Sequence, residues 1–319
     1  MDLAKADTFA QQPGIYLSDD EPSNQKPFSS QGGLNRVFIF PTESLGQIRM
    51  AEGPFQHATT LIAYRDFTPL QLVASAYLFK HPHLINRFRS DELGQVDLQN
   101  CDENLGKILE NLVRMKSLRN LNLTDSTVND SHLPIIGEMS GLAALNLTGS
   151  RLTGAALAKL KNLRQLEALS CTQVADPKPL LLAFQKMPQL KVLDFSRANV
   201  DESDVLALSK IKTLTRLDVT GEIAVNDKTI VHFCAFPSLV YLDIEFCPIT
   251  AKSIPSFKKM HALRQLHLSP TGWTDKQKLE LAKAVGSGCE INWSKKNPGI
   301  KEIDNILNDV HKYSNSIEN

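Results

Sequence analysis

The chain has 319 residues, of which 42% are hydrophobic, so it is long enough for one elongated domain or two ordinary ones with a substantial core. Lysine plus arginine and aspartate plus glutamate both number 35, so no net charge attracts nucleic acid or an anionic membrane. Aromatic residues make up only 7% of the chain, which argues against a surface that stacks bases.

The N-terminal region, residues 1–33, is rich in Gln, Ser, Pro and Asp and has no hydrophobic period, so it is predicted to be a disordered tail. It lacks the basic end and apolar run of a signal peptide. The longest apolar stretch, Leu72 to Phe79, is far shorter than the roughly 20 residues that a membrane-spanning helix needs. Five widely spaced cysteines without a C-x-x-C favour a reducing compartment. We therefore expect a cytoplasmic protein with no membrane partner.

Residues 34–92 are predicted to form an N-terminal capping region. Residues 35–51 contain two apolar segments around a Pro-Thr-Glu-Ser turn, a pattern typical of two short strands. Leu70 to Leu72 predicts a further strand, and the apolar run from Ala76 to Phe88 predicts a helix. An array of repeats begins directly afterwards, and the first open face of such an array needs a cover.

A pattern of three apolar positions, Leu-x-x-Leu-x-Leu, returns every 24 or 25 residues from residue 93 onward. A strand alternates the direction of its side chains, so the last two apolar residues point to one side and the residue between them to the other. A fixed period of this length is typical of a repeat array. The copies begin at Leu93, Leu118, Leu142, Leu166, Leu190, Leu214, Leu239 and Leu263, and a degenerate copy spans Cys289 to Trp293.

Each predicted strand is followed by a polar corner and then by a segment with helical periodicity, such as Leu152 to Leu160 or Val205 to Ile211. Asp, Ser or Thr stands near the start of each such segment, where N-caps are expected. One strand plus one helix cannot bury its own apolar face, whereas stacked neighbours can. With right-handed crossovers, residues 93–293 are predicted to form an α/β solenoid of about eight repeats, with a parallel β-sheet on the concave face and helices on the convex face.

Residues 90–293 resemble the leucine-rich repeat family, most closely the ribonuclease-inhibitor-like and bacterial repeats written L-x-x-L-x-L-x-x-T-x-I-T-D-x-x-L-x-x-L. Thr127-Val128-Asn129-Asp130 matches the tail of this motif, and so does Val225-Asn226-Asp227. The resemblance implies the solenoid fold just described. It also implies that the concave face binds a protein.

The copy that begins at Leu166 departs from the motif. Val174 comes two residues early, and Pro177 and Pro179 follow it. Proline removes a backbone donor and restricts the residue before it. The corner and the helix of this repeat are therefore predicted to be irregular.

Residues 294–319 are predicted to be a linker followed by an amphipathic helix. Ser294 to Gly299 is a polar break. The apolar residues after it recur at helical spacing and fall on one face; they are Ile300, Ile303, Leu307 and Val310. Two roles remain open for this helix, which either covers the last repeat or detaches to bind a partner.

No known catalytic or cofactor signature occurs in the sequence. The phosphate-binding patterns G-x-x-x-x-G-K and G-x-G-x-x-G are absent, and so is the G-x-S-x-G elbow. His81-Pro82-His83 has no further ligand at metal-binding spacing, and Cys171 takes the place of a core leucine. We therefore expect a protein that is not an enzyme, with no catalytic residue, metal, cofactor or small-molecule substrate.

The candidate binding residues are those that point outward from the predicted strands. Along the central column, small neutral residues give way to acidic ones toward the C-terminal end. Aspartates on neighbouring strands, about 4.8 Å apart, destabilise a sheet, so the column is either a docking patch or a solvated polar ladder. The predicted patch consists of Asp194, Arg216, Asp218, Tyr241, Asp243, Glu245 and His267, with Tyr241 as its anchor.

The function predicted from these features is protein–protein interaction, with a partner that presents a basic or amide-rich surface to the concave face. Nucleic acid is not expected as a partner. The alternative is a targeting or regulatory arm of an enzyme system, such as a bacterial repeat region associated with a serine/threonine kinase or a substrate adaptor of a ubiquitin ligase. Fold alone does not decide between these functions.

Overall fold

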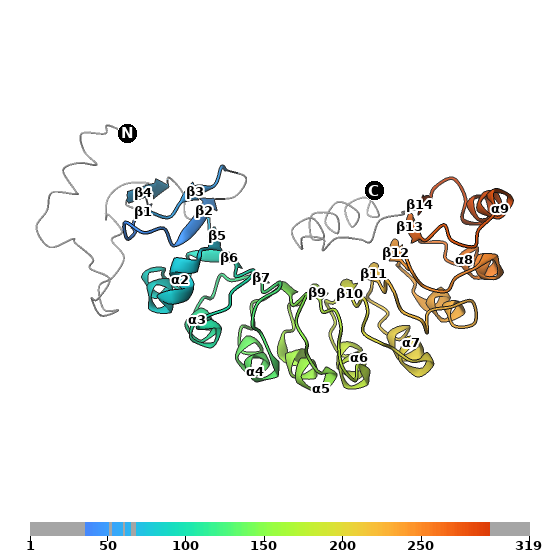
Figure 1. Ribbon diagram of the computed structural model, residues 1–319, viewed down its shortest axis with the longest axis horizontal. Coiled ribbons are helices and arrows are strands. Elements are labelled where there is room, and N and C mark those ends of the chain that lie inside the picture. The colour runs from blue at the N-terminus through green and yellow to red at the C-terminus, as the bar shows by residue number, and fades with distance from the viewer. Residues whose placement is uncertain (1–35, 51–52, 60, 65–67, 294–319) are drawn as a thin grey trace, which may run out of the picture.

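The chain forms an arc in which the strands lie along the inner edge and the helices along the outer edge (Figure 1). The computed structural model describes residues 36–50, 53–59, 61–64 and 68–293. The predicted N-terminal tail at 1–33 and the predicted linker and helix at 294–319 lie outside the described residues.

One sheet of twelve strands runs along the arc in the order β3-β2-β5-β6-β7-β8-β9-β10-β11-β12-β13-β14 and does not close on itself. Neighbouring strands are parallel from β5 to β14. The β2–β3 and β2–β5 pairs are antiparallel. The strands are β2 (Gly46–Met50), β3 (Gln56–His57), β5 (Leu70–Ala74), β6 (Leu93–Asp97), β7 (Asn120–Asn122), β8 (Ala144–Asn146), β9 (Ala168–Ser170), β10 (Val192–Asp194), β11 (Arg216–Asp218), β12 (Tyr241–Asp243), β13 (Gln265–Leu268) and β14 (Glu290–Trp293).

The repeated leucines form the core of the arc, as predicted. Leu121, Leu145 and Leu169 align across β7, β8 and β9, and the same alignment continues as far as Ile291 in β14. These three leucines are at most 1% exposed, and burying each side chain stabilises the fold by about 1.5–3 kcal/mol. The predicted α/β solenoid with a parallel sheet and leucine-rich repeats is therefore confirmed.

Short helices cover the convex side of the sheet (Figure 1). The α-helices are α2 (Ala76–Lys80), α3 (Leu105–Leu112), α4 (Leu133–Ile136), α5 (Gly154–Leu157), α6 (Lys178–Phe184), α7 (Glu202–Leu208), α8 (Ile254–Phe257) and α9 (Asp275–Val285). The 3₁₀-helices are Pro82–Arg87, Asp130–His132, Ala158–Asn162, Ile230–Ala235 and Ala251–Ser253. Among the described residues, no helix combines the length and the apolar character needed to cross a membrane.

The corners between strands and helices join each repeat to the next. Thr153 caps α5, and its backbone N–H and hydroxyl both donate to the Asp130 carboxylate of the preceding corner, at 3.0 and 2.8 Å. Asp227 receives the N–H and hydroxyl of Thr250 in the same way. The polar residues of the predicted corners therefore act as caps and lateral ties, which satisfy helix N–H groups that would otherwise lack partners.

The repeat that begins at Leu166 has a regular helix despite its two prolines. Gln173 and Asp176 adopt left-handed φ angles of 57° and 48°, but Arg197 and Asn199 in the next corner do so as well, so these angles do not set this corner apart. The prediction of an irregular helix was wrong, because α6 is a seven-residue α-helix. Pro177 stands at its N-cap and Pro179 in its first turn, where the missing N–H removes no intrahelical hydrogen bond.

The N-terminal region contains the predicted strands, but they belong to two sheets. β1 (Arg36–Ile39) pairs with β4 (Leu61–Tyr64) in a separate antiparallel pair, whereas β2 joins the long sheet next to β5. Gly46 begins β2 with φ of 133°, and a Cβ at this position would lie 2.0 Å from the carbonyl oxygen of Val73. Glycine therefore allows β2 to approach β5, which places the β2–β3 hairpin at the N-terminal end of the concave face.

Candidate functional site

The seven residues of the predicted patch come together on the concave side of β10 to β13. The strand register aligns Asp194, Asp218, Asp243 and His267 in one row. Arg216 aligns with Tyr241 in the neighbouring row, and Glu245 follows the end of β12. The register of the rows is as predicted, but the exposure of the side chains differs from what a docking patch needs.

Tyr241 lies in a stack of three side chains. The guanidinium carbon of Arg216 is 3.6 Å from the centre of the tyrosine ring, and the ring of His267 is 4.8 Å away, centre to centre. The tyrosine hydroxyl donates to Asp243 Oδ2 at 3.1 Å, and burial, followed by the charge of Asp243, raises the pKa of Tyr241. Because only 5% of Tyr241 is exposed, the predicted role as an anchor that inserts into a partner does not fit this geometry.

Asp243 and Glu245 are also buried, at 1% and 2% exposure. Asp243 Oδ1 accepts hydrogen bonds from the hydroxyl of Thr220 and from the N–H of Glu245, both at 3.2 Å, and Asp243 Oδ2 lies 3.5 Å from His267 Nδ1. Within the described ranges, Asp243, Glu245 and His267 each bring one possible metal ligand to within 4.8 Å of the others. The bonds to Asp243 already give this group a structural role, and we assign no metal to it.

Asp218 lies half-buried between two other carboxylates, those of Asp194 and Asp243. The hydroxyl of Ser196 is 2.6 Å from Asp194 Oδ1 and 3.0 Å from Asp218 Oδ1, and the N–H of Thr220 donates to Asp218 Oδ1 at 2.9 Å. Burial, and then the charges of the two neighbouring aspartates, raise the pKa of Asp218 to about 7. The row therefore carries less negative charge near neutral pH than its sequence implies.

We expect Asp218→Asn to stabilise the protein at high pH and to have no effect at low pH. Folded Asp218 holds its proton up to about pH 7, while the unfolded side chain ionises near its ordinary pKa of 3.8. The stability that comes from the protonated form is therefore fully present below pH 3.8 and is lost as the pH rises through 7. Removing the repulsion between Asp218 and the carboxylates of Asp194 and Asp243 should raise the free energy of unfolding by on the order of 1 kcal/mol at high pH, since like charges on neighbouring strands destabilise a sheet by such amounts.

Thermal unfolding of the Asp218→Asn variant and the wild type, followed from mildly acidic to mildly alkaline pH, tests this expectation. The variant should melt about 2 °C higher at alkaline pH and at the same temperature in acid. Asp102→Asn, at an exposed position, is the matched control and should change neither value. An equal gain at both ends of the pH range would contradict the assignment.

The middle of the concave face offers few accessible side chains. The outward positions of β8 and β9 are at most 2% exposed. Ala144 and Ala168 are 0% and 1% exposed, and the polar residues Asn146 and Ser170 are both 2% exposed. The accessible polar groups of the concave face therefore lie toward its two ends.

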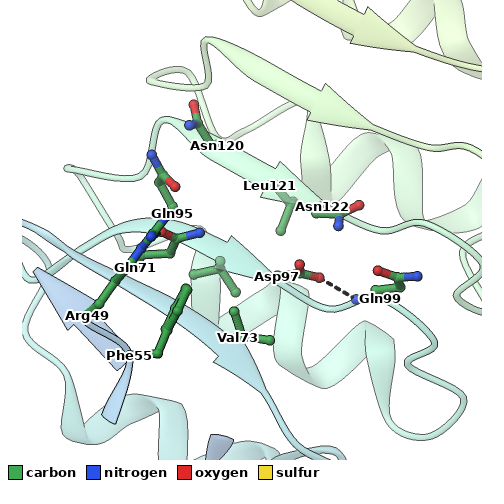
Figure 2. A pocket seen from close by; sticks show the side chains of 11 residues that line it. Arg49, Phe55, Gln71, Val73, Gln95, Asp97, Gln99, Asn120, Leu121 and Asn122 are labelled. Atoms are coloured by element: carbon green, nitrogen blue, oxygen red, sulfur yellow. Dashed lines mark hydrogen bonds between the residues drawn. The ribbon is translucent and has the colours of Figure 1, made fainter. Parts of the chain in front are cut away.

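A pocket of about 410 Å³ opens at the N-terminal end of the concave face (Figure 2). This volume falls in the range of roughly 300–1,000 Å³ that is usual for ligand pockets. Its walls come from β2, the segment between β2 and β3, and the strands β5, β6 and β7 with the residues just after them. The lining residues are Arg49, Phe55, Gln71, Val73, Gln95, Val96, Asp97, Gln99, Asn120, Leu121 and Asn122.

The polar residues of the pocket form rows across the strands. The register aligns Gln71 with Gln95 and Gln95 with Asn120. Arg49 extends this row onto β2, where it aligns with Gln71 and donates its Nε–H to the Gln71 carboxamide oxygen. The guanidinium carbon of Arg49 also lies 4.3 Å from the ring centre of Phe55. The pocket thus combines carboxamides, one aromatic ring and the Arg49 guanidinium, which is held by Gln71 and Phe55.

The sequence pattern placed Gln95, Asn120 and their neighbours on the outward side of the strands but did not mark them as a site. Arg49 and Phe55 were missed, because they belong to a hairpin whose position depends on long-range pairing with β5. The signal that was present is the run of carboxamides in consecutive repeats, which contrasts with the small residues at the same positions of the next repeats.

Comparisons with known proteins found similar solved structures. No protein-family model matches the chain, and no curated protein matches it. Among solved structures, 239 chains are similar. One of them is an internalin from Listeria monocytogenes, which is 17% identical, with a TM-score of 0.47 and coverage of 68% of this chain and 71% of the internalin chain. The leucine-rich repeat architecture of this chain is established by the register and burial of its own repeats.

Proposed function

We propose that the protein is a non-enzymatic recognition module that binds a protein partner on its concave face. The observation that carries this proposal is the pocket at β5–β7, where hydrogen-bonding side chains from consecutive repeats line an accessible hollow. Loops and surface concavities held by a rigid scaffold are common binding sites. The solenoid is such a scaffold, since each repeat is fixed to its neighbours along a continuous sheet.

The chemistry of the accessible groups favours a partner with amide or basic groups. Toward the C-terminal end, Asp194, Asp218 and His267 are only partly buried, and toward the N-terminal end the pocket is rich in carboxamides. The buried residues Tyr241, Asp243 and Glu245 support the face from beneath rather than contact the partner. We expect most of the contact at the N-terminal end, where the groups are arranged around a hollow.

Site-specific photo-crosslinking in cells that naturally produce the protein tests the proposal. A photoreactive amino acid replaces Gln99 or Asn120 on the concave face, or the exposed convex residues Leu182 and Leu206, which are 52% and 42% exposed. We expect one protein to crosslink from the concave positions and not from the convex ones, and excess unlabelled wild-type protein to compete with it. Crosslinks from the convex positions alone would overturn the proposal.

A further inference from the structure

The charged groups of the N-terminal pocket balance one another. Arg49 is its cation and is engaged with Gln71 and the ring of Phe55. Asp97 is its carboxylate, and it accepts the backbone N–H of Gln99 at 2.9 Å. No surplus charge remains in the lining to attract a phosphate group, a nucleic acid or a strongly charged peptide. The pocket therefore favours a ligand that is polar but uncharged.

Several carboxamides of the pocket have hydrogen-bonding capacity to spare. Gln95 and Asn120 are partly buried, Gln99 is exposed, and no hydrogen bond joins these three side chains to another group in the described part of the chain. Each carboxamide offers both donors and an acceptor. Leaving such groups partly desolvated without partners costs free energy that a bound ligand can recover.

The spacing of these groups fits an extended main chain. Gln95 and Asn120 are aligned on adjacent parallel strands, about 4.8 Å apart, and Asp97 is aligned with Asn122 in the second row. Every peptide group except that of proline carries one donor and one acceptor, which matches what each carboxamide offers. At about 3.3 Å per residue, three residues of an extended peptide span the two steps across β5, β6 and β7. Such a peptide passes one carboxamide per strand along the row of Gln71, Gln95 and Asn120.

One edge of the pocket is apolar. Phe55 is 37% exposed, with the Arg49 guanidinium over its ring, and Val73 of β5 stands half-buried beside it. Figure 2 shows Phe55 and Val73 on the side of the pocket nearest the β2–β3 hairpin, with Asp97, Gln99 and Asn122 on the other side. This edge offers a contact for one apolar side chain of the ligand.

We propose that this pocket binds an extended, uncharged segment of a partner protein, chiefly through the main chain of that segment. The segment crosses β5, β6 and β7, its peptide groups pair with the carboxamides of Gln95, Gln99 and Asn120, and one apolar side chain packs on Phe55. This proposal rests on the proposed function, and it specifies which kind of segment of the partner protein is bound.

The test uses a random dodecapeptide library selected against the full-length protein. Binding of the enriched peptides is then measured by fluorescence anisotropy for the wild type and for the double variant Gln95→Ala/Asn120→Ala. We expect uncharged peptides with one apolar position, and about a tenfold weaker affinity for the variant, since it loses two neutral hydrogen bonds. The matched control, Gln165→Ala/Asn162→Ala, changes exposed residues outside the pocket and should keep wild-type affinity.

N-methylation of the peptide backbone separates main-chain from side-chain recognition. Methyl groups at the N–H positions that face the carboxamides should weaken binding about tenfold, while alanine substitution should matter only at the apolar position that contacts Phe55. Failure to enrich any peptide, a charged consensus, or binding that survives the pocket variant would overturn the inference. If crosslinks from Gln99 or Asn120 to a partner protein are still found in that case, the proposed function stands, and only the recognition of an extended, uncharged segment through its main chain fails.

Discussion

Replacing Glu222 by alanine is expected to lower the free energy of unfolding by about 2–5 kcal/mol. The Glu222 side chain is 2% exposed and reaches back to the preceding repeat, where its two carboxylate oxygens accept the N–H groups of Ala198 and Val200. Ala198 and Val200 are themselves buried. Removing the carboxylate would leave two buried donors unsatisfied, at roughly 1–3 kcal/mol each.

The same interaction predicts a graded series at this position. Burial raises the pKa of Glu222, and the backbone N–H groups act against that shift. Glu222→Gln keeps one acceptor oxygen but points an NH₂ group at the other backbone donor, so we expect a smaller loss of about 1–2 kcal/mol. Glu202→Ala is the control, because it removes an exposed ion pair with Lys228 at 2.9 Å, worth at most about 1 kcal/mol.

Urea unfolding followed by circular dichroism gives the order of these variants. The expected ranking of stability is wild type and Glu202→Ala highest, Glu222→Gln next and Glu222→Ala lowest. A Glu222→Ala variant as stable as the wild type would show that water or a shifted backbone satisfies the two N–H groups. Glu222 would then not stabilise the contact between the two repeats.

The arc of repeats was predictable because one short pattern specifies it many times. The alignment of Leu121 with Leu145 and Leu169 follows from the fixed period alone, since each repeat must bury its apolar face against the next. The irregular helix expected from Pro177 and Pro179 was a wrong prediction, because α6 is regular. The N–H groups of the first helical turn have no intrahelical acceptor, so a proline there removes no hydrogen bond from the helix.

The site was only partly predictable, because the repeat pattern determines neither the exposure of individual side chains nor the pairing of strands far apart in the sequence. The rows of acidic residues follow from the period, but the burial of Tyr241 depends on its stacking with Arg216 and His267. The pocket depends on the antiparallel pairing of β2 with β5, which brings Arg49 and Phe55 to the concave face. No periodicity links these two residues to β6 and β7, so the sequence indicated only the run of carboxamides and not the hairpin that completes the pocket.

A leucine-to-alanine substitution in the middle of the solenoid should destabilise more repeats than the same substitution near its end. Leu217 in β11 and Leu266 in β13 are both fully buried, and leucine-to-alanine changes in cores cost about 2–5 kcal/mol. In a repeat array, each unit is stabilised mainly by its own packing and its two neighbours. Leu217→Ala therefore weakens a repeat that joins two long halves, while Leu266→Ala weakens one close to the end of the described sheet.

Hydrogen exchange followed by mass spectrometry distinguishes the two outcomes. For Leu266→Ala, we expect faster exchange in β13, β14 and α9, with unchanged protection in β5 to β7 and unchanged peptide binding at the pocket. For Leu217→Ala, we expect loss of protection to spread to both neighbours of β11. Leu279→Ala, at a side chain that is 56% exposed, should leave exchange unchanged. If Leu266→Ala instead weakened protection at β5 to β7, the solenoid would unfold as a single unit, and the pocket would depend on repeats far from it in the arc.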